Sequence, residues 1–357
     1  MHTKGGQSLE FLFSRAQQET VILYGETLAS VLREQKVVAE QVIIFTNQRY
    51  YDRFYEKLTR LFLPNSVSWY ICTNQVYCNN FTEFTHGMDF LGHYPKQSRV
   101  LIVGFGNEGI MALSSFIHAT AVLNTALWLI PVSLRGLAKS VKERAIVVRK
   151  PDIPMLENPN APGYVIYDQT IADKQQEGKI VDFLLLIRCG VVGDPQFIKA
   201  LYRSYPDQSS MMKQSFAAYT DKVIELYQQQ GAYLEEFGQL FTEALYQTEN
   251  GHLLSDTMKI FYGFLFHFFW TVNQQQLTVD LVQFGQWLYR LGYPVALPES
   301  FSISDYLTHV LDLQKKEKKL LFLSKVGTIG GRVAVNEEDL VQTLTSYEQL
   351  IKQIRGN

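Results

Sequence analysis

The feature that most limits how this chain can fold is the alternation of strand-like and helix-like segments along its first 135 residues. Short apolar runs alternate with segments whose apolar residues recur at helical spacing. The strand-like runs cover residues 19–25, 41–47, 66–73, 99–105 and 125–132, and the helical segments cover residues 28–36, 50–63, 83–94 and 110–123. Because strands joined through helices pair in parallel, this order predicts a mostly parallel sheet with helices on both faces.

A different pattern begins near residue 175. Residues 151–164 contain four prolines and predict a break in regular structure, and residues 163–168 form one more strand-like run. Helical segments then follow at residues 181–192, 195–205, 210–230, 233–248 and 277–293, with an aromatic helix after Ser255. Ser255 is a suitable N-cap for that helix, and Gly292 is a suitable terminator for the last one.

These patterns predict an α/β fold class with two domains. We expect a Rossmann-like N-terminal domain with a mostly parallel sheet in residues 1–175, and an all-helical C-terminal domain in residues 176–357. A chain of 357 residues is long enough for each domain to bury its own core.

Composition excludes several classes of protein. The formal charge of −2 leaves no positive field that would gather nucleic acid. Cys72, Cys78 and Cys189 lack paired spacing, which argues against a disulfide framework and for a reducing compartment. The longest apolar stretch, residues 260–272, is too short to span a bilayer and predicts a buried helix. We therefore expect a cytoplasmic protein that binds neither nucleic acid nor membrane.

A glycine-rich turn follows the run at residues 99–105. Gly104, Gly106 and Gly109 have G-x-G-x-x-G spacing between a strand-like and a helical segment, which is the context of a dinucleotide-binding loop. Such loops need glycine because backbone N–H groups must approach a pyrophosphate at a helix N-terminus. The acidic residue that would hold a ribose hydroxyl about 20 residues further on is missing, and Glu108 would place a negative charge near any phosphate. A working loop and a loop that has lost this role both remain open.

Five stretches of the sequence carry a resemblance to a known family. They are residues 43–58, 106–131, 161–171, 186–201 and 306–333, and they include GNEGIMALSSFIHATAVLNTALWLIP and LIRCGVVGDPQFIKAL. Their order resembles 3-dehydroquinate synthase, the zinc- and NAD-dependent lyase of the shikimate pathway, and its sugar-phosphate cyclase and glycerol dehydrogenase relatives. The resemblance covers nearly the whole chain. It implies the same two-domain fold, a cleft between the domains, and a homodimer.

Many positions that carry the family's chemistry are substituted. In a register without gaps, the second and third glycines of the family's NAD loop become Asn107 and Glu108, and its phosphate-binding arginine becomes Leu123. Lys139 falls where the family has the aspartate of its D-S-S-V-G-G-K-T signature.

The zinc ligands implied by the resemblance are one Glu and two His, and a catalytic zinc site needs three such donors on one cavity wall. Leu185 occupies the Glu position, and Arg188 replaces the lysine that follows it. GHLLSD keeps one histidine as His252 and has Asp256 where the family has its next histidine, whereas residues 273–276 offer none at the last ligand position.

We expect a divergent relative that has lost this chemistry, needs no cofactor, and acts as a pseudoenzyme that binds a small ligand or a protein partner in the interdomain cleft. The alternative is an active 3-dehydroquinate synthase or related cyclase with a remodelled site. That alternative implies NAD at Gly104, Gly106 and Gly109, a metal at His252 and Asp256, and catalytic roles for Arg188, Lys222 and Lys315. His267, flanked by phenylalanines in the aromatic helix, is expected to have a core role.

Overall fold

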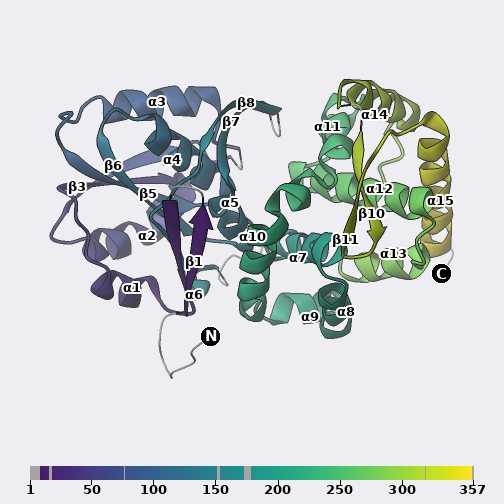
Figure 1. Cartoon of the computed structure of the whole chain (residues 1–357), viewed down its shortest axis with the longest axis horizontal. Helices are drawn as coiled ribbons and strands as arrows, with labels where there is room; N and C mark the ends of the chain where they lie inside the picture. The colour runs from purple at the N-terminus through teal and green to yellow at the C-terminus, as the bar shows by residue number, and fades with distance from the viewer. Residues whose placement is uncertain are drawn as a thin grey trace. The chain divides into compact units, whose positions relative to one another are not determined.

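The computed structural model describes residues 9–15, 18–75, 77–150, 153–172, 178–317 and 319–355 (Figure 1). The chain forms two compact units. We call them the sheet unit, which comprises Met1–Gln176 and Ser215–Gln228, and the helical unit, which comprises Glu177–Gln214 and Gln229–Asn357. The boundary predicted at residue 175 lies close to the first junction, but residues 215–228 belong to the sheet unit and not to the C-terminal part.

The sheet unit is built on one seven-stranded sheet. Its strands are β1 (Leu9–Arg15), β2 (Gln18–Tyr24), β3 (Gln41–Asn47), β4 (Ser66–Cys72), β5 (Arg99–Gly106), β6 (Asn124–Pro131) and β9 (Tyr164–Tyr167). They lie in the order β1-β2-β9-β6-β5-β3-β4, and every neighbouring pair except β1 and β2 is parallel. The mostly parallel sheet predicted from the sequence is therefore confirmed, with β1 as an additional antiparallel edge strand.

Helices follow the parallel strands in the predicted alternation. They are α1 (Leu28–Glu34), α2 (Gln48–Leu61), α3 (Phe81–Leu91), α4 (Glu108–Thr120), α5 (Leu134–Ser140) and α6 (Gln169–Ala172). On β5, Phe105 packs against Phe54 of α2 with 5.1 Å between ring centroids, whereas Gly104 faces Ser114 of α4. Because successive residues of a strand point to opposite faces, α2 and α4 cover opposite faces of the sheet.

The break in regular structure predicted for residues 151–164 is wrong over most of its length. Ile153–Pro159 forms strand β8, which pairs antiparallel with β7 (Arg144–Lys150) as a separate two-stranded sheet. Positions 151 and 152 lie outside the described residues. Two prolines are tolerated because β8 pairs with β7 alone and the register shifts after Val147, and proline is accepted at such edges and bulges.

The helical unit contains eight helices of its own in the described part of the chain: α7 (Lys179–Gly193), α8 (Pro195–Ser204), α9 (Gln208–Lys213), α11 (Gln239–Gln247), α12 (Asp256–Gln275), α13 (Leu281–Arg290), α14 (Ile303–Glu317) and α15 (Glu337–Arg355). It also contains the antiparallel hairpin of β10 (Leu320–Lys325) and β11 (Thr328–Val333). The expectation of an all-helical domain is corrected by this hairpin. The chain reverses there because Gly327 adopts a φ of 77°, which glycine accepts without strain.

Two predicted helices are interrupted. The helix predicted for residues 233–248 breaks at Gly238, whose φ is 96°; a Cβ there would lie 2.9 Å from the Phe264 backbone of α12. Residues 210–230 form α9, a 3₁₀ turn η2 (Ala217–Tyr219) and the first part of α10 (Thr220–Glu236). The dihedral angles of Gln230 inside α10 are not helical.

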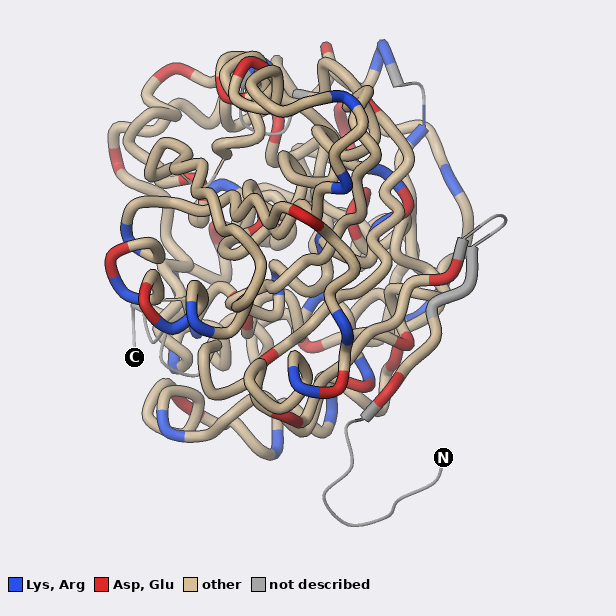
Figure 2. The backbone as a smooth tube through the Cα atoms, turned by 90° about the vertical axis from the view of Figure 1, so that its left-hand side faces the viewer, with Lys and Arg blue, Asp and Glu red and all other residues tan. Residues whose placement is uncertain are grey.

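Helix α12 forms the core of the helical unit, as predicted for the apolar stretch. All residues from Phe261 to Val272 are buried. The predicted cap and terminator are confirmed, since the Ser255 hydroxyl accepts a hydrogen bond from Met258 N, and Gly292 adopts a φ of 91°. Over the described residues, no helix has the length and apolar character needed to cross a membrane. Figure 2 shows basic and acidic residues interspersed along the backbone.

Candidate functional site

The strand order creates a topological switch point between β3 and β5. From β3 the chain moves to β4 on one side, and it then returns to β5 on the other side of β3. Open α/β sheets bind ligands outside the carboxyl ends of their strands at such a point. Here those ends are Asn47 and Gly106. The glycine turn noted in the sequence therefore lies where this fold favours a ligand.

The three glycines of the turn have different structural roles. Gly104 lies within β5, where a Cβ would come within 2.8 Å of Ser114 Oγ, so its absence lets α4 pack closely on the strand. Gly106 ends the strand with a φ of 153°, in the region that favours glycine. Gly109 is buried in the first turn of α4. The strand, turn and helix of a dinucleotide-type loop are all present.

The protein's own polar groups occupy the N-terminus of α4. Asn107 caps the helix, with its Oδ1 accepting a hydrogen bond from Ile110 N at 3.2 Å. The Oε1 atom of Glu108 lies 2.8 Å from Arg135 Nη1, and these side chains are only 15% and 23% exposed. A carboxylate at this position is stabilised by the helix dipole as well as by the guanidinium. A pyrophosphate would have to approach the same helix end beside a charge of its own sign.

Arg135 is the residue of this site that the sequence analysis missed. The Ser133 hydroxyl accepts a hydrogen bond from Gly136 N at 3.0 Å, which begins α5 and places Arg135 in its first turn. A backbone hydrogen bond of 3.1 Å from Val132 N to Gly106 O ties this segment to the glycine turn. A serine cap directly after a buried strand was the available signal, but it gives no indication of which charge the arginine faces.

Asn47 is a second polar group at the switch point. Its side chain is 1% exposed, and its Nδ2 donates a hydrogen bond to Thr73 O at 2.5 Å. Its Oδ1 accepts no hydrogen bond from the described residues, and the same holds for Glu108 Oε2. Both atoms are buried acceptors. These two buried acceptors favour ligand groups that donate hydrogen bonds, such as hydroxyl or ammonium groups.

The two candidate metal ligands, His252 and Asp256, have different surroundings. His252 is exposed in the 3₁₀ turn η3 (Gly251–Leu253), which precedes α12. Asp256 accepts a hydrogen bond from Tyr246 Oη at 2.8 Å and lies 3.9 Å from Lys259 Nζ. Burial lowers the pKa of Lys259, and the Asp256 carboxylate opposes that shift. No group of three His, Cys, Asp or Glu side chains that could hold a metal ion occurs among the described residues.

His267 has a core role, as the sequence predicts. Its Nδ1 accepts a hydrogen bond from Gly238 N and its Nε2 bonds to Leu321 O, each at 2.7 Å. The Phe237 ring stacks on the imidazole at a centroid distance of 4.0 Å. Burial lowers the pKa of His267 to about 4, although the bond to Leu321 O opposes the shift. The neutral ring joins α12 to the turn before α11 and to β10, and both of its nitrogens are used in doing so.

The three catalytic candidates occupy different settings. Arg188 lies on α7, and its buried Nε donates no hydrogen bond within the described part of the chain. On the same helix, Leu185 at the family's Glu position is apolar and 6% exposed. Lys222 forms an ion pair of 3.2 Å with Glu225 in the sheet unit. Lys315 of the helical unit is largely exposed and pairs with Asp312 at 2.9 Å.

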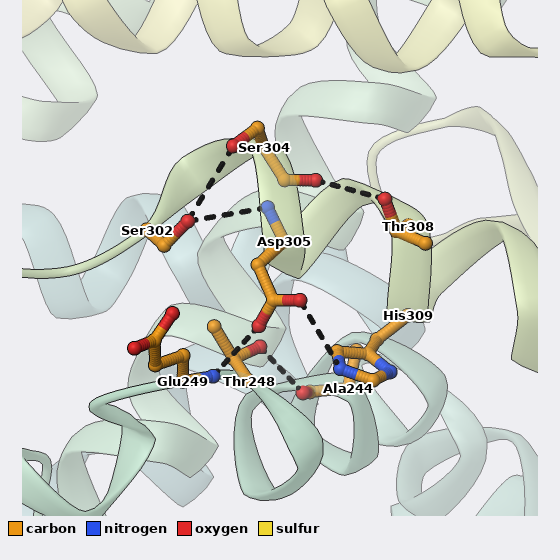
Figure 3. Close-up of polar contacts among 8 residues, drawn as sticks. All are labelled: Ala244, Thr248, Glu249, Ser302, Ser304, Asp305, Thr308 and His309. Carbon is orange, nitrogen blue, oxygen red and sulfur yellow. Dashed lines mark hydrogen bonds and ion pairs between the residues drawn. The ribbon is translucent and has the colours of Figure 1, made fainter.

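A polar cluster at the start of α14 contains an aspartate, a histidine and hydroxyl groups (Figure 3). Asp305 accepts a hydrogen bond from Glu249 N at 2.7 Å, and His309 Nε2 lies 3.5 Å from its other oxygen. The Ser302 hydroxyl faces Asp305 N and Ser304 Oγ. Among the described residues no hydroxyl is hydrogen-bonded to His309, so the cluster lacks the nucleophile and base contact of a hydrolase. It caps α14 and holds the loop after α11.

Solved structures with this fold include cyclases and dehydrogenases. The 2-epi-5-epi-valiolone synthase from Streptomyces hygroscopicus subsp. jinggangensis 5008, solved with NAD⁺ and Zn²⁺ bound, matches with a TM-score of 0.74 at 13% identity, over 94% of this chain and 98% of that one. A 2-deoxy-scyllo-inosose synthase solved with carbaglucose-6-phosphate, NAD⁺ and Co²⁺ gives 0.72 at 12% identity, over 95% and 99%. The glycerol dehydrogenase of Schizosaccharomyces pombe gives 0.60 at 12% identity, over 88% and 85%. The fold is that of the sugar-phosphate cyclases and their dehydrogenase relatives.

Sequence comparison leads to the same group. The 3-dehydroquinate synthase of Listeria innocua is 23% identical over 267 residues, which are 72% of each chain, and that of Listeria monocytogenes is 22% identical over the same length. No protein-family model matches the chain. The chain is thus similar to the 3-dehydroquinate synthases in sequence and shares the fold of related cyclases, which confirms the resemblance stated from its motifs.

Proposed function

We propose that this chain is a non-catalytic member of its family that binds a small hydroxyl- or ammonium-bearing ligand in place of NAD. The ion pair between Glu108 and Arg135 at the N-terminus of α4 carries the proposal. In a dinucleotide loop the helix end is left for a pyrophosphate, whereas here a carboxylate stands beside it.

Coulomb's law gives the size of the repulsion between the Glu108 carboxylate and a bound phosphate. A phosphate about 4 Å from a carboxylate meets a repulsion of about 4 kcal/mol at the effective dielectric constant of a protein surface. Binding would also require Arg135 to leave Glu108, whose other oxygen is buried without a hydrogen bond from the described residues. The residues at this turn therefore do not fit NAD.

The side chains of the helical unit at the family's metal-ligand positions likewise do not fit a catalytic zinc ion. Leu185 has no lone pair to offer, and both His267 nitrogens are already hydrogen-bonded. His252 and Asp256 supply at most two donors, and the contacts of Asp256 are with Tyr246 and Lys259.

The second candidate function is an active cyclase with a remodelled site. It is favoured by the names of the curated relatives and by the NAD⁺ and metal ions in the solved structures of similar proteins. In that case Arg135 would turn from Glu108 to a phosphate. The two candidates therefore assign opposite roles to the same ion pair.

Calorimetric titration with NAD separates them. We expect no binding by the wild-type chain at millimolar NAD and measurable binding after Glu108→Gln, which removes the repelling charge and releases Arg135. Glu337→Gln, which neutralises an acidic residue in the first turn of α15, is the matched control and should leave NAD binding absent. Tight NAD binding by the wild type, or turnover of the seven-carbon heptulosonate phosphate with added zinc or cobalt, would establish the cyclase instead.

A further inference from the structure

A groove of about 830 Å³ lies entirely within the helical unit. We call it the α8–α13 groove, because those helices form two of its walls. The segment after α12 and the turn between β10 and β11 close the other sides. Its volume is in the range of small-molecule sites and is too small for a folded partner. None of the residues considered above for NAD, metal or catalysis lines it.

Aromatic rings form the floor of the groove. Trp287 lies between Tyr202 of α8 and Phe284 of α13, at centroid distances of 5.3 and 5.9 Å, and Phe268 of α12 packs on Phe284 at 5.0 Å. The indole N–H of Trp287 donates a hydrogen bond to Tyr205 O at 2.7 Å. Trp287 itself is fully buried, whereas Tyr202 and Phe284, whose rings are tilted by 58° and 56° to the indole, are only partly buried. These two rings therefore form the apolar surface that a ligand ring can contact.

Three basic side chains stand on the rim. Lys199 and Arg203 are one helical turn apart on α8, and Lys325 ends β10. None of the three forms an ion pair or a hydrogen bond with the described residues. The groove's single carboxylate, Asp280, accepts a hydrogen bond from Gln283 N at 2.9 Å as the N-cap of α13. The rim is therefore electropositive, and its cations are available to a ligand.

The walls are held in place by backbone contacts. Gly327 N donates a hydrogen bond to Val191 O at 2.7 Å, which fixes the β10–β11 turn against α7. A Cβ on Gly327 would lie 2.2 Å from Pro195 Cδ, so the turn and the start of α8 are in direct contact. The groove thus exists before any ligand arrives, and binding requires little ordering of the protein.

We propose that the α8–α13 groove binds a small aromatic anion, with its ring against Tyr202 and Phe284 and its carboxylate or phosphate between Lys199, Arg203 and Lys325. Carboxylate and phosphate share the chemistry that these cations recognise. The site is independent of the β5–α4 turn, so it stands whether or not the chain binds NAD.

Titration calorimetry of the full chain tests this with naphthoate, naphthyl phosphate and the neutral isostere naphthamide. We expect one site per chain for whichever anion is preferred, and about tenfold weaker binding in Lys199→Gln and in Arg203→Gln because each removes a charge-assisted contact. Arg290→Gln removes an exposed arginine of α13 outside the groove and should change the affinity less than twofold. Naphthamide should bind more weakly and show no response to these variants.

Three results would overturn the proposal. One is the absence of saturable binding of either anion at millimolar concentration. Another is equal affinity in Lys199→Gln, Arg203→Gln and the Arg290→Gln control. The third is inorganic phosphate binding as tightly as naphthyl phosphate, since the aromatic floor would then contribute nothing. Circular dichroism of each variant verifies that the fold is unchanged.

Discussion

At the scale of single residues, His267 links the stability of the helical unit to pH. Its pKa is about 4 in the folded chain and about 6.5 when exposed, so the folded state resists protonation. The stabilisation is complete above pH ~6.5 and is lost as the pH falls toward ~4, by about 3 kcal/mol in total. We expect His267→Gln to be less stable at neutral pH and to lose less stability on acidification, as measured by denaturant unfolding at several pH values. His252→Gln, at an exposed histidine, should keep the wild-type acid response; equal pH slopes in all three proteins would refute this role.

The candidate site was predictable only where its signal is local. Gly104, Gly106 and Gly109 could be placed on a strand, a turn and a helix because these assignments depend on neighbours along the chain. The pairing of Glu108 with Arg135 could not, since it arises only when the β5–α4 and β6–α5 segments meet through the parallel register of β5 and β6. Long-range electrostatics of this kind leave no periodic trace in a sequence.

At the scale of elements, α12 ends at a residue whose backbone conformation is strained, and a substitution can relieve this strain. Gln276 is the C-cap with a φ of 49°, and the Leu277 N to Val272 O hydrogen bond of 3.0 Å closes the turn as in a Schellman motif. A left-handed conformation costs a non-glycine residue about 1 kcal/mol, so Gln276→Gly should raise the free energy of unfolding by about that amount. Gln275→Gly, at the last helical residue, should lower it. Thermal unfolding of the pair is the measurement, and two shifts of the same sign would contradict the assignment.

Element types were predictable wherever one periodicity dominates. The parallel strands and α12 are long apolar segments whose pattern has one interpretation. Strand β8 was missed because its prolines mark turns more often than bulged edge strands. The break at Gly238 depends on the approach of α12 and has no signal in residues 233–248 beyond a single glycine.

At the scale of the whole molecule, residues 215–228 return from the helical unit to the sheet unit and form a connection that stabilises it. Val223 and Ile224 are fully buried, and Asp221 accepts a hydrogen bond from Tyr24 at the end of β2. Burial and this carboxylate together raise the pKa of Tyr24. Tyr24→Phe should cost about 1–2 kcal/mol and speed amide hydrogen exchange in residues 215–228. Tyr289→Phe, at a side chain that is 58% exposed, is the control, and unchanged exchange in both variants would count against the connection.

The chain passes between its two units three times, after residues 176, 214 and 228. During synthesis the first unit therefore cannot be completed when its last strand leaves the ribosome, because a further segment must still emerge and return to it. For the same reason, no single cleavage of the polypeptide yields two complete halves. Because the segments of the two units alternate along the chain, misfolding of one unit hinders the folding of the other. Expression of either unit alone should therefore begin from a gene in which the two segments of that unit are joined directly.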